Sequence, residues 1–543
     1  MILADKTFFG GEIFTMEKEG EKVSALVILD GKIIYAGSDD EALKFETREK
    51  VNLKGRVVLP GFNDTHIHTV TDCFMRSYIK LGDVESIDEI IEILEENKDG
   101  PEDEWIMAAG LFSDKVKEKR YPNRKELDRV KTKRPIFINS HCGHIQILNT
   151  VALKLGNVPN KDIELNEKLE YYETGEPNGI FKESSFGRYF AEIMGKQWSK
   201  TSFRIAALKD GLKEYSKVGL TSLHSVATMP DDTPIEQFNQ YFELEKEGLL
   251  PQRINILPAD YLPWTAGPTT GFGTEMVKLA GRKIFLDGSL GGHTAAMIEP
   301  FSDDPSNKGI MTQTREGLEK QFKEATEQGL DIAIHVIGDA AMELVLDVAE
   351  KVFPKIDEPC PYLRLKKAPR RLRIIHAMIV NDEQIKRIKK LPIILEMQPF
   401  FIDSDIQIAV DRLGEDRIDT FMPMKKFYDN GILMSGGSDA PVDPAVPLNG
   451  IQCAVTRRNL KGFPENGLVI KEALNIYQAV EIFTKNAAYC AEEENIKGTL
   501  SIGKYADFIV LDKNIFETNP EEISKIRVLK TFVGGENTWD MEA

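Results

Sequence analysis

The sequence predicts an α/β fold: a (β/α)8 TIM barrel with a discontinuous β-sandwich domain and an insertion after the first barrel strand. In the middle of the chain, β-like apolar runs alternate with helical segments, which is typical of a parallel βα architecture. Both ends of the chain, residues 1–56 and 497–543, instead contain short β-like runs separated by glycine turns. We expect these two ends to pair with each other as one composite β-sandwich domain.

Eight apolar runs are candidates for the strands of the barrel. They cover residues 57–68, 219–226, 252–260, 282–288, 330–339, 371–379, 392–400 and 431–439. Amphipathic segments such as REGLEKQFKEATEQG and NDEQIKRIKKL lie between the later runs and are expected to form helices. About 150 residues separate the first two strands, whereas a βα unit needs roughly 30. We therefore expect residues 57–496 to form the barrel domain, with residues 72–200 as a subdomain inserted over its open end.

The composition favours a cytoplasmic protein that acts on a small-molecule substrate. The formal charge is −18 and no block of basic residues is present, so nucleic acid and anionic membranes are not expected partners. No apolar run approaches the ~20 residues of a membrane helix, and the first residues lack the basic start and apolar core of a secretory signal. The five cysteines are scattered and include no CxxC pair, which fits a reducing compartment. The β-sandwich offers a surface for a possible homodimer, although no residue pattern requires one.

The few histidines fall where the metal ligands of a barrel are expected. The first strand ends in His66 and His68, whose imidazoles point to the same side because side chains alternate along a strand. His335 on the fifth strand and His376 on the sixth each follow a three-residue run, IAI and RII. Both lie near a C-terminal strand end, where barrel active sites are found. The alternatives are a pair of surface-loop histidines, or core histidines satisfied by a hydrogen-bond partner. Two such histidines on adjacent strands favour ligands.

An aspartate and a lysine extend this pattern. Asp439 ends the eighth strand within SGGSDAPV and faces the same open end, with a helix N-cap or turn role as the alternative. Lys283, Phe285 and Asp287 share one face of the fourth strand by alternation. A lysine inside a barrel is costly unless its charge is neutralised or paired. Carbamylation by CO2 would convert it into a carboxylate able to bridge two metals, while a salt bridge or an outward-facing side chain would explain it equally.

Taken together, these motifs resemble the amidohydrolase superfamily. The shared features are GFNDTHIH on the first strand, the strand-four lysine, single histidines on strands five and six, and SDAPV on strand eight. The segment GTLSIGKYADFIVLD resembles the return strand of the family's β-sandwich. More narrowly, DGSLGGHTAAM, HVIGDAAMELVLD and the CGH-x4-N element from Cys142 to Asn149 resemble the amidohydrolase-3 branch, which includes N-substituted formamide deformylase-like enzymes. The resemblance covers essentially the whole chain, insertion included.

The resemblance implies a role for each candidate residue. The implied metal ligands are His66, His68, His335, His376 and Asp439, with carbamylated Lys283 as a bridging ligand if the centre is binuclear. Asp439 is also the implied catalytic base. The implied substrate-binding residues are His144, Asp287 and His293, where His144 has a role in internal loop structure as its alternative. Since His293 stands where the branch often has arginine, the substrate specificity of the branch is not carried over to this chain.

Histidine and carboxylate ligands without a CxxC pair suit one or two Zn²⁺ ions with an open coordination position. Zinc would lower the pKa of bound water to ~7, so that hydroxide attacks a non-peptide amide, N-acyl or formamide C–N bond. Asp439 would pass the proton to the leaving nitrogen. A cyclic amide hydrolase or a deaminase on the same site is the alternative enzyme. A catalytically inactive scaffold protein is the alternative of another class, although every expected ligand position is filled.

Overall fold

The structure is a computed structural model that describes residues 3–113, 115–140, 145–160, 169–182, 185–198, 201–227, 234–259, 267–353 and 371–542. The chain divides into two compact units. The first unit takes residues 1–70, 209–228 and 233–543, and the second takes residues 71–208 and 229–232. The predicted bounds of the composite β-sandwich and of the insertion remain predictions. The place of the insertion over the barrel also remains a prediction.

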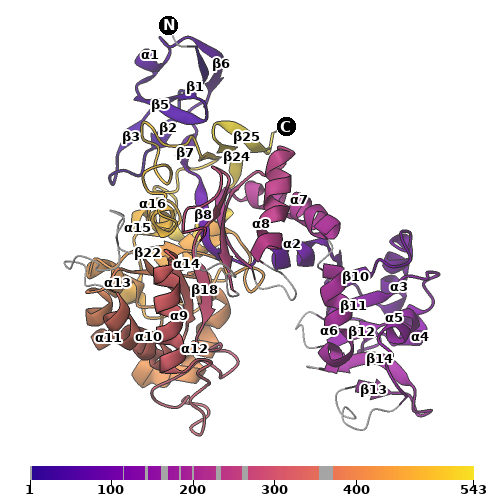
Figure 1. The fold of residues 1–543 in the computed structure, drawn as a ribbon. Helices are drawn as coiled ribbons and strands as arrows, with labels where there is room; N and C mark the ends of the chain where they lie inside the picture. The colour runs from indigo at the N-terminus through magenta and orange to yellow at the C-terminus, as the bar shows by residue number, and fades with distance from the viewer. Residues whose placement is uncertain are drawn as a thin grey trace. The chain divides into compact units, whose positions relative to one another are not determined.

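Parallel strands that alternate with helices form the centre of the first unit (Figure 1). One parallel sheet has the order β17-β16-β15-β8, and the other has the order β18-β19-β20-β21-β22. Their bounds are β8 Phe62–Ile67, β15 Leu220–Ala227, β16 Arg253–Pro258, β17 Val277–Leu279, β18 Arg282–Phe285, β19 Ile332–Val336, β20 Leu372–His376, β21 Ile393–Met397 and β22 Met434–Gly436. A strand lies within each of the eight predicted runs. The α/β class is therefore confirmed, whereas the described strands pair as two sheets and not as one closed ring.

The single strand expected over residues 57–68 is two strands that meet at Gly61. β7 (Val57–Pro60) pairs antiparallel with β23 (Phe508–Leu511), while β8 pairs parallel with β15. A Cβ atom at Gly61 would lie 2.2 Å from Thr221 Cγ2. Only glycine therefore allows the chain to pass this close to Thr221 where it leaves one sheet and enters the other. Both strands are buried along their whole length, and hydrophobicity alone does not reveal such a division.

Helices connect the parallel strands and begin at residues that suit a helix N-terminus. Thr314 caps α9 by accepting a hydrogen bond from Gly317, and Asn381 forms a capping box with Gln384 at α11. The helices of this unit are α1 Asp39–Ala42, α8 Pro234–Lys246, α9 Arg315–Glu327, α10 Asp339–Val352, α11 Asp382–Ile388, α12 Phe401–Arg417, α13 Met424–Asp429, α14 Pro447–Thr456, α15 Ile476–Ile482 and α16 Lys485–Cys490, with short 3-10 turns η2 Ile418–Thr420, η3 Ile470–Glu472 and η4 Pro520–Lys525. Helices α2 Thr69–Ser77 and α7 Thr201–Lys217 run from one unit into the other along the chain.

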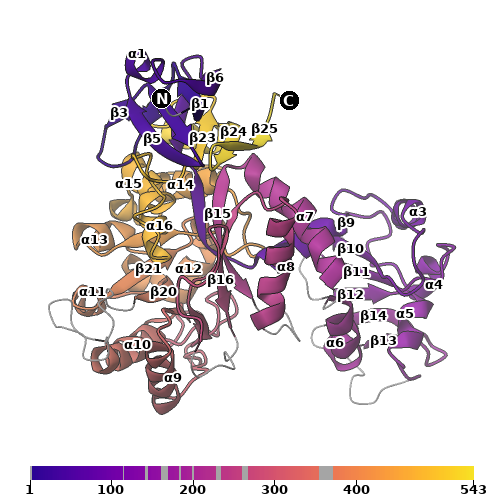
Figure 2. The same ribbon diagram turned by 45° about the horizontal axis from the view of Figure 1, so that its top comes forward.

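Two further sheets of this unit contain strands from the ends of the chain, and strands of both ends occur together in the second of them (Figure 2). One has the order β5-β4-β1-β6 and the other has the order β25-β24-β23-β7-β2-β3. The remaining bounds are β1 Ala4–Phe9, β2 Glu12–Phe14, β3 Lys22–Val23, β4 Ala25–Leu29, β5 Lys32–Gly37, β6 Thr47–Asn52, β24 Val528–Val533 and β25 Glu536–Asp540. Phe8 packs edge-on against Phe508 and Phe532, with ring centroids 4.9 and 5.1 Å away. Both chain ends therefore contribute to one apolar core.

The second unit has its own sheet and its own core. The sheet order is β13-β14-β12-β11-β10-β9, in which β9, β10 and β11 are parallel and the remaining pairs are antiparallel. Its elements are β9 Ile79–Lys80, α3 Ile87–Glu96, β10 Ile106–Leu111, α4 Arg124–Leu127, β11 Ile136–Ser140, β12 Ile145–Leu148, α5 Thr150–Leu155, β13 Leu169–Tyr171, β14 Pro177–Lys182 and α6 Ser185–Trp198. Its apolar core is formed by side chains of this unit alone. Across both units, no described helix combines the length and apolar character needed to cross a bilayer.

Candidate metal centre

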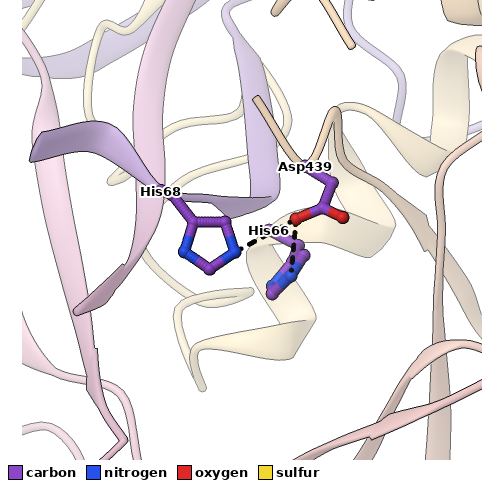
Figure 3. Close-up of side chains that lie close together, drawn as sticks. All are labelled: His66, His68 and Asp439. Atoms are coloured by element: carbon purple, nitrogen blue, oxygen red, sulfur yellow. Dashed lines mark ion pairs between the residues drawn. The ribbon is translucent and has the colours of Figure 1, made fainter. Parts of the chain in front are cut away.

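Two histidines and one aspartate converge at the end of β8 (Figure 3). Asp439 Oδ1 lies 3.1 Å from His66 Nε2 and 3.2 Å from His68 Nε2. One potential ligand atom from each residue lies within 4.8 Å of the other two. In the described part of the chain, Asp439 Oδ1 is buried and receives no aligned hydrogen bond. A buried oxygen that faces two imidazole nitrogens without bonding to them has the surroundings of a metal ligand.

The backbone holds these residues together. The Asp439 amide donates to the His66 carbonyl at 2.7 Å, and the His68 amide donates to the Ala440 carbonyl at 2.9 Å. Asp439 has a left-handed backbone with φ 61°, and His376, which ends β20, has φ 74°. Left-handed backbone is uncommon for residues other than glycine, and it tends to occur at functional sites. The chain thus turns sharply at two of the predicted ligands.

The protonation states of the cluster suit a cation. Burial, aided by the charge of Lys283, lowers the pKa of His66 to about 3. Burial likewise lowers the pKa of His335 to about 4 and that of His376 well below the usual range. Burial opposes ionisation of Asp439, but the neighbouring His66 and His68 hold its pKa well below the usual range. Neutral imidazoles beside an ionised carboxylate are the states in which these groups bind metals.

His376 and His335 complete a row of imidazoles. The His376 ring lies 5.4 Å from that of His66 and 4.4 Å from that of His335, measured between centroids. His376 Nδ1 lies 2.7 Å from Gln398 Oε1, and His335 Nε2 lies 3.0 Å from the Gly288 carbonyl. Amide and carbonyl oxygens only accept hydrogen bonds, so each of these nitrogens donates. His376 Nε2 and His335 Nδ1 are thereby left with lone pairs for a metal.

Lys283 is the fully buried lysine at this cluster. It is 1% exposed, its Nζ lies 3.4 Å from His66 Nε2, and among the described residues no carboxylate lies within 4 Å of it. Burial lowers its pKa to about 7, although the charges of Asp439 and Glu396 oppose this. The structure therefore supports neither the salt bridge nor the outward-facing side chain, which were the alternatives to carbamylation of this lysine.

The predicted substrate-binding residues have different surroundings. Asp287 accepts hydrogen bonds from the backbone amides of Ala296, Ile337 and Gly338 at 2.8 to 3.1 Å, and so ties the loop after β18 to the turn after β19. His293 Nε2 lies 3.2 Å from Asp303, within that same loop. His144 lies outside the described residues. A role in substrate binding remains a prediction for all three.

Sequence reasoning missed several polar residues beneath the cluster. Asp64 accepts hydrogen bonds from the backbone amides of His66 and Ser438. Gln398 bonds His376, and Arg373 on β20 pairs with Glu396 on β21 where both side chains are fully buried. Asp64 lies among other polar residues of β8, whereas Gln398, Arg373 and Glu396 each lie in or just beyond a mostly apolar strand. The signal that singled out His335 and His376 was therefore present for these three residues as well.

Comparison with known proteins identifies the family of the chain and structures of similar fold. Residues 49–538 match the family model described as the amidohydrolase family. The Bacillus subtilis protein YtcJ, named provisionally as an amidohydrolase, is 31% identical over 550 residues, which include 98% of each chain. The N-substituted formamide deformylase of Arthrobacter pascens is 22% identical over 558 residues, again 98% of each chain. The crystal structure of an uncharacterised metal-dependent hydrolase from Pyrococcus furiosus is similar with a TM-score of 0.78 and 26% identity, over 94% of this chain and 100% of that one.

Proposed function

Because the chain belongs to the amidohydrolase family, we propose that it is a zinc-dependent hydrolase that cleaves an amide or formamide C–N bond in a small molecule. The family and the metal-dependent hydrolases of similar fold support hydrolysis. The observation that carries the proposal is the buried Asp439 Oδ1, 3.1 and 3.2 Å from two imidazole nitrogens and without an aligned hydrogen bond from the described residues.

The donor atoms fit zinc. Three-ligand sets of histidine with carboxylate, open on one side, are typical of catalytic zinc sites, whereas structural sites are closed and usually rich in cysteine. A divalent metal bound here would supply Lewis-acid activation of water and of the substrate carbonyl. The residues that would hold it are His66, His68, His335, His376 and Asp439.

Asp439 is the proposed base. Its Oδ1 faces the two histidines, which leaves Oδ2 to accept a proton from the attacking water and return it to the leaving nitrogen. Its low pKa keeps it ionised at neutral pH. Lys283 would bridge two metals if carbamylated. A buried amine with a pKa of about 7 is partly neutral at physiological pH, and the neutral amine is the form that reacts with CO2.

The favoured substrate class is an N-substituted formamide. The Arthrobacter pascens relative is named for deformylation of N-substituted formamides, which favours a formamide over a cyclic amide or an amino-substituted ring. At 22% identity this relative suggests a starting substrate class for the search. The loop after β18, which Asp287 ties in place, is a candidate for selecting among these substrates.

The test is a screen of N-formyl amines, N-acyl amino acids and cyclic amides with zinc-loaded protein. We expect Asp439→Asn to lower kcat by about 10²- to 10⁴-fold, the usual contribution of a general base. Asp429→Asn serves as the matched control, since Asp429 is an exposed residue on α13 that pairs with Lys425. Activity on any of these substrates that is unchanged in Asp439→Asn would contradict the assignment of the base.

A further inference from the structure

Arg373 lies in the interior of the first unit with its guanidinium fully enclosed. It belongs to β20, three residues before His376, and is 0% exposed. Its Nε donates to Glu396 Oε1 on β21. Its Nη2 donates to the carbonyl of Thr65 at 3.2 Å and to His224 Nδ1 at 2.8 Å. The side chain therefore bonds to three strands besides its own.

These bonds connect the two parallel sheets. β20 and β21 are adjacent in one sheet, whereas Thr65 on β8 and His224 on β15 belong to the other. In the described part of the chain, no β-ladder joins these sheets. Backbone hydrogen bonds between β8 and the segment after β22 join the two sheets on one side. β20 lies two strands away from β22 in its sheet. Arg373 therefore spans the interior where the backbone makes no connection.

The bond to Thr65 ends next to a predicted ligand. Thr65 precedes His66 on β8, and Arg373 precedes His376 by three residues on β20. The His66 and His376 rings lie 5.4 Å apart, nearly perpendicular at 89°. Any change in the distance between β8 and β20 would change the separation of these two imidazoles. The bond of Arg373 to the Thr65 carbonyl directly connects β20 to β8.

Arginine suits this position for a physical reason. Its planar fork presents several donors in fixed directions, whereas the ammonium of lysine is a point charge on a flexible stem. A buried guanidinium is costly unless a carboxylate compensates it and its donors are bonded. Glu396, also 0% exposed, supplies the carboxylate. The charge pair therefore fixes the guanidinium, and Nη2 bonds to β8 and β15, while Nη1 has no hydrogen-bond partner among the described residues.

We propose that Arg373 is a positioning residue for the metal centre, which holds the strand of His66 at a fixed distance from the strand of His376. The inference rests on the proposed function, because it concerns the same centre. Arg373 touches neither substrate nor metal in this proposal and acts through the Thr65 carbonyl. Glu396 is the partner that keeps the guanidinium in place.

Arg457 provides a matched control. It is also 0% exposed, and its guanidinium donates to the carbonyls of Phe421, Met422 and Leu468 at 2.9 to 3.1 Å, with none of the predicted ligands among its partners. Wild type, Arg373→Lys, Glu396→Gln and Arg457→Lys would be prepared without metal and titrated with Co²⁺. The readouts are the visible absorption of Co²⁺, which reports ligand geometry, the Co²⁺ dissociation constant, and thermal unfolding of the metal-free protein.

We expect both lysine variants to unfold at lower temperature than wild type. Arg373→Lys is expected to bind Co²⁺ about tenfold more weakly, as for other residues that orient metal ligands from outside, with a shifted absorption band. Arg457→Lys should keep the wild-type band and affinity. Glu396→Gln, which is nearly isosteric, should show the same change as Arg373→Lys to a smaller extent, and it decides the question if Arg373→Lys does not fold.

A folded Arg373→Lys or Glu396→Gln with the wild-type band and affinity would overturn the inference, as would an equal shift in Arg457→Lys. Failure of the proposed function is distinct from this outcome. If wild type itself bound neither Co²⁺ nor Zn²⁺, the metal centre would be refuted, and the inference with it. If wild type binds Co²⁺ and the variants do not differ from it, only the role of Arg373 is refuted.

Discussion

Asp64 Oδ1 accepts a hydrogen bond from the backbone amide of His66 at 3.1 Å, two residues further along the same strand. The same oxygen accepts a second hydrogen bond, from the amide of Ser438 at 3.0 Å. Ser438 precedes Asp439, so one carboxylate oxygen joins the segment of two predicted ligands to the segment of a third. Burial raises the pKa of Asp64 to about 7, and these amides counteract part of that rise. Asp64 therefore connects the chain segment of His66 and His68 to the chain segment of Asp439.

We expect Asp64→Asn and Asp64→Ala to behave differently. Asparagine keeps an oxygen at Oδ1, so both amides stay bonded and zinc affinity should change little. Alanine leaves two buried amides without an acceptor, which costs about 1–3 kcal/mol per group in folding stability, and zinc affinity should fall with it. Isothermal titration with Zn²⁺ and urea unfolding of the metal-free proteins measure both effects. Equal zinc affinity in Asp64→Ala and wild type would show that Asp64 does not position the ligands.

Gln398 fixes the tautomer of His376, which leads to a second prediction. Gln398→Leu removes the acceptor of His376 Nδ1, so the ring would no longer be held with Nε2 toward the metal. Loss of such a partner typically lowers metal affinity about 10- to 100-fold. Gln407→Leu is the control, because Gln407 is exposed on α12 and bonds Asp411. Zinc competition with a chromophoric chelator measures the affinities, and equal values for both variants would contradict this role of Gln398.

Much of the fold was predictable because strand periodicity and apolar runs depend on local sequence. Every predicted strand region contains a strand, but the pairing of β7 with the chain ends and the short strand β17 were not foreseen. β7 and β8 are both buried and only Gly61 separates them, at the point where Thr221 approaches from another strand. That approach is set by tertiary contacts, which a single sequence does not contain.

The predicted ligands come from chain segments far apart, and the structure brings their side chains into one cluster. The partners behind them were not predicted. Arg373 and Glu396 stand alone as charged residues in apolar strands, which indicates a buried partner without identifying it. Lys283, flagged for the same reason, lies beside His66 instead of an acid. The contact between Lys283 and His66 crosses from one sheet to the other. It therefore depends on the spacing of the two sheets, which is a property of the whole fold.

Metal removal gives a third prediction. A ligand that binds only the folded state stabilises it by about 2.7 kcal/mol at 100 times its dissociation constant. Chelation should therefore lower the unfolding temperature and abolish hydrolysis, and added Zn²⁺ should restore both. His68→Asn, which removes an imidazole 3.2 Å from Asp439 Oδ1, should reduce the stabilisation by zinc. A protein purified without metal whose stability is unaffected by chelation and by zinc would instead favour the inactive scaffold.

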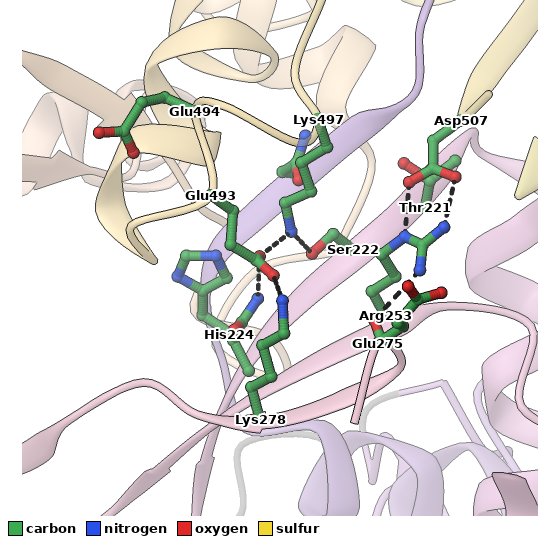
Figure 4. A network of polar contacts seen from close by, with 12 residues as sticks. Thr221, Ser222, His224, Arg253, Glu275, Lys278, Glu493, Glu494, Lys497 and Asp507 are labelled. Atoms are coloured by element: carbon green, nitrogen blue, oxygen red, sulfur yellow. Dashed lines mark hydrogen bonds and ion pairs between the residues drawn. The ribbon is translucent and has the colours of Figure 1, made fainter. Parts of the chain in front are cut away.

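Glu493 is the centre of a buried ionic network that joins the C-terminal region to the parallel strands (Figure 4). Its carboxylate lies 2.5 Å from the Nζ atoms of both Lys278 and Lys497, and Asn255 donates to it at 3.0 Å. Lys497 also donates to Ser222 on β15 at 2.6 Å. Burial alone would raise the pKa of Glu493, but the two lysines lower it to about 2.

This network leads to a fourth prediction, on stability at acid pH. The folded pKa of Glu493 lies below its ordinary value of 4.5, so the unfolded chain binds the proton more readily. Its contribution to the free energy of unfolding, on the order of 3 kcal/mol, is present in full above about pH 5 and is lost as the pH falls toward 2.

Glu493→Gln should be less stable than wild type at pH 7, and the difference should shrink as the pH falls through this window. Glu494→Gln, which loses a partly exposed pair with Arg371, is the control and should lose less stability than Glu493→Gln at pH 7. Urea unfolding from pH 7 to pH 3 measures these curves, and a Glu493→Gln deficit that stays constant with pH would show that the charge of Glu493 does not stabilise the fold.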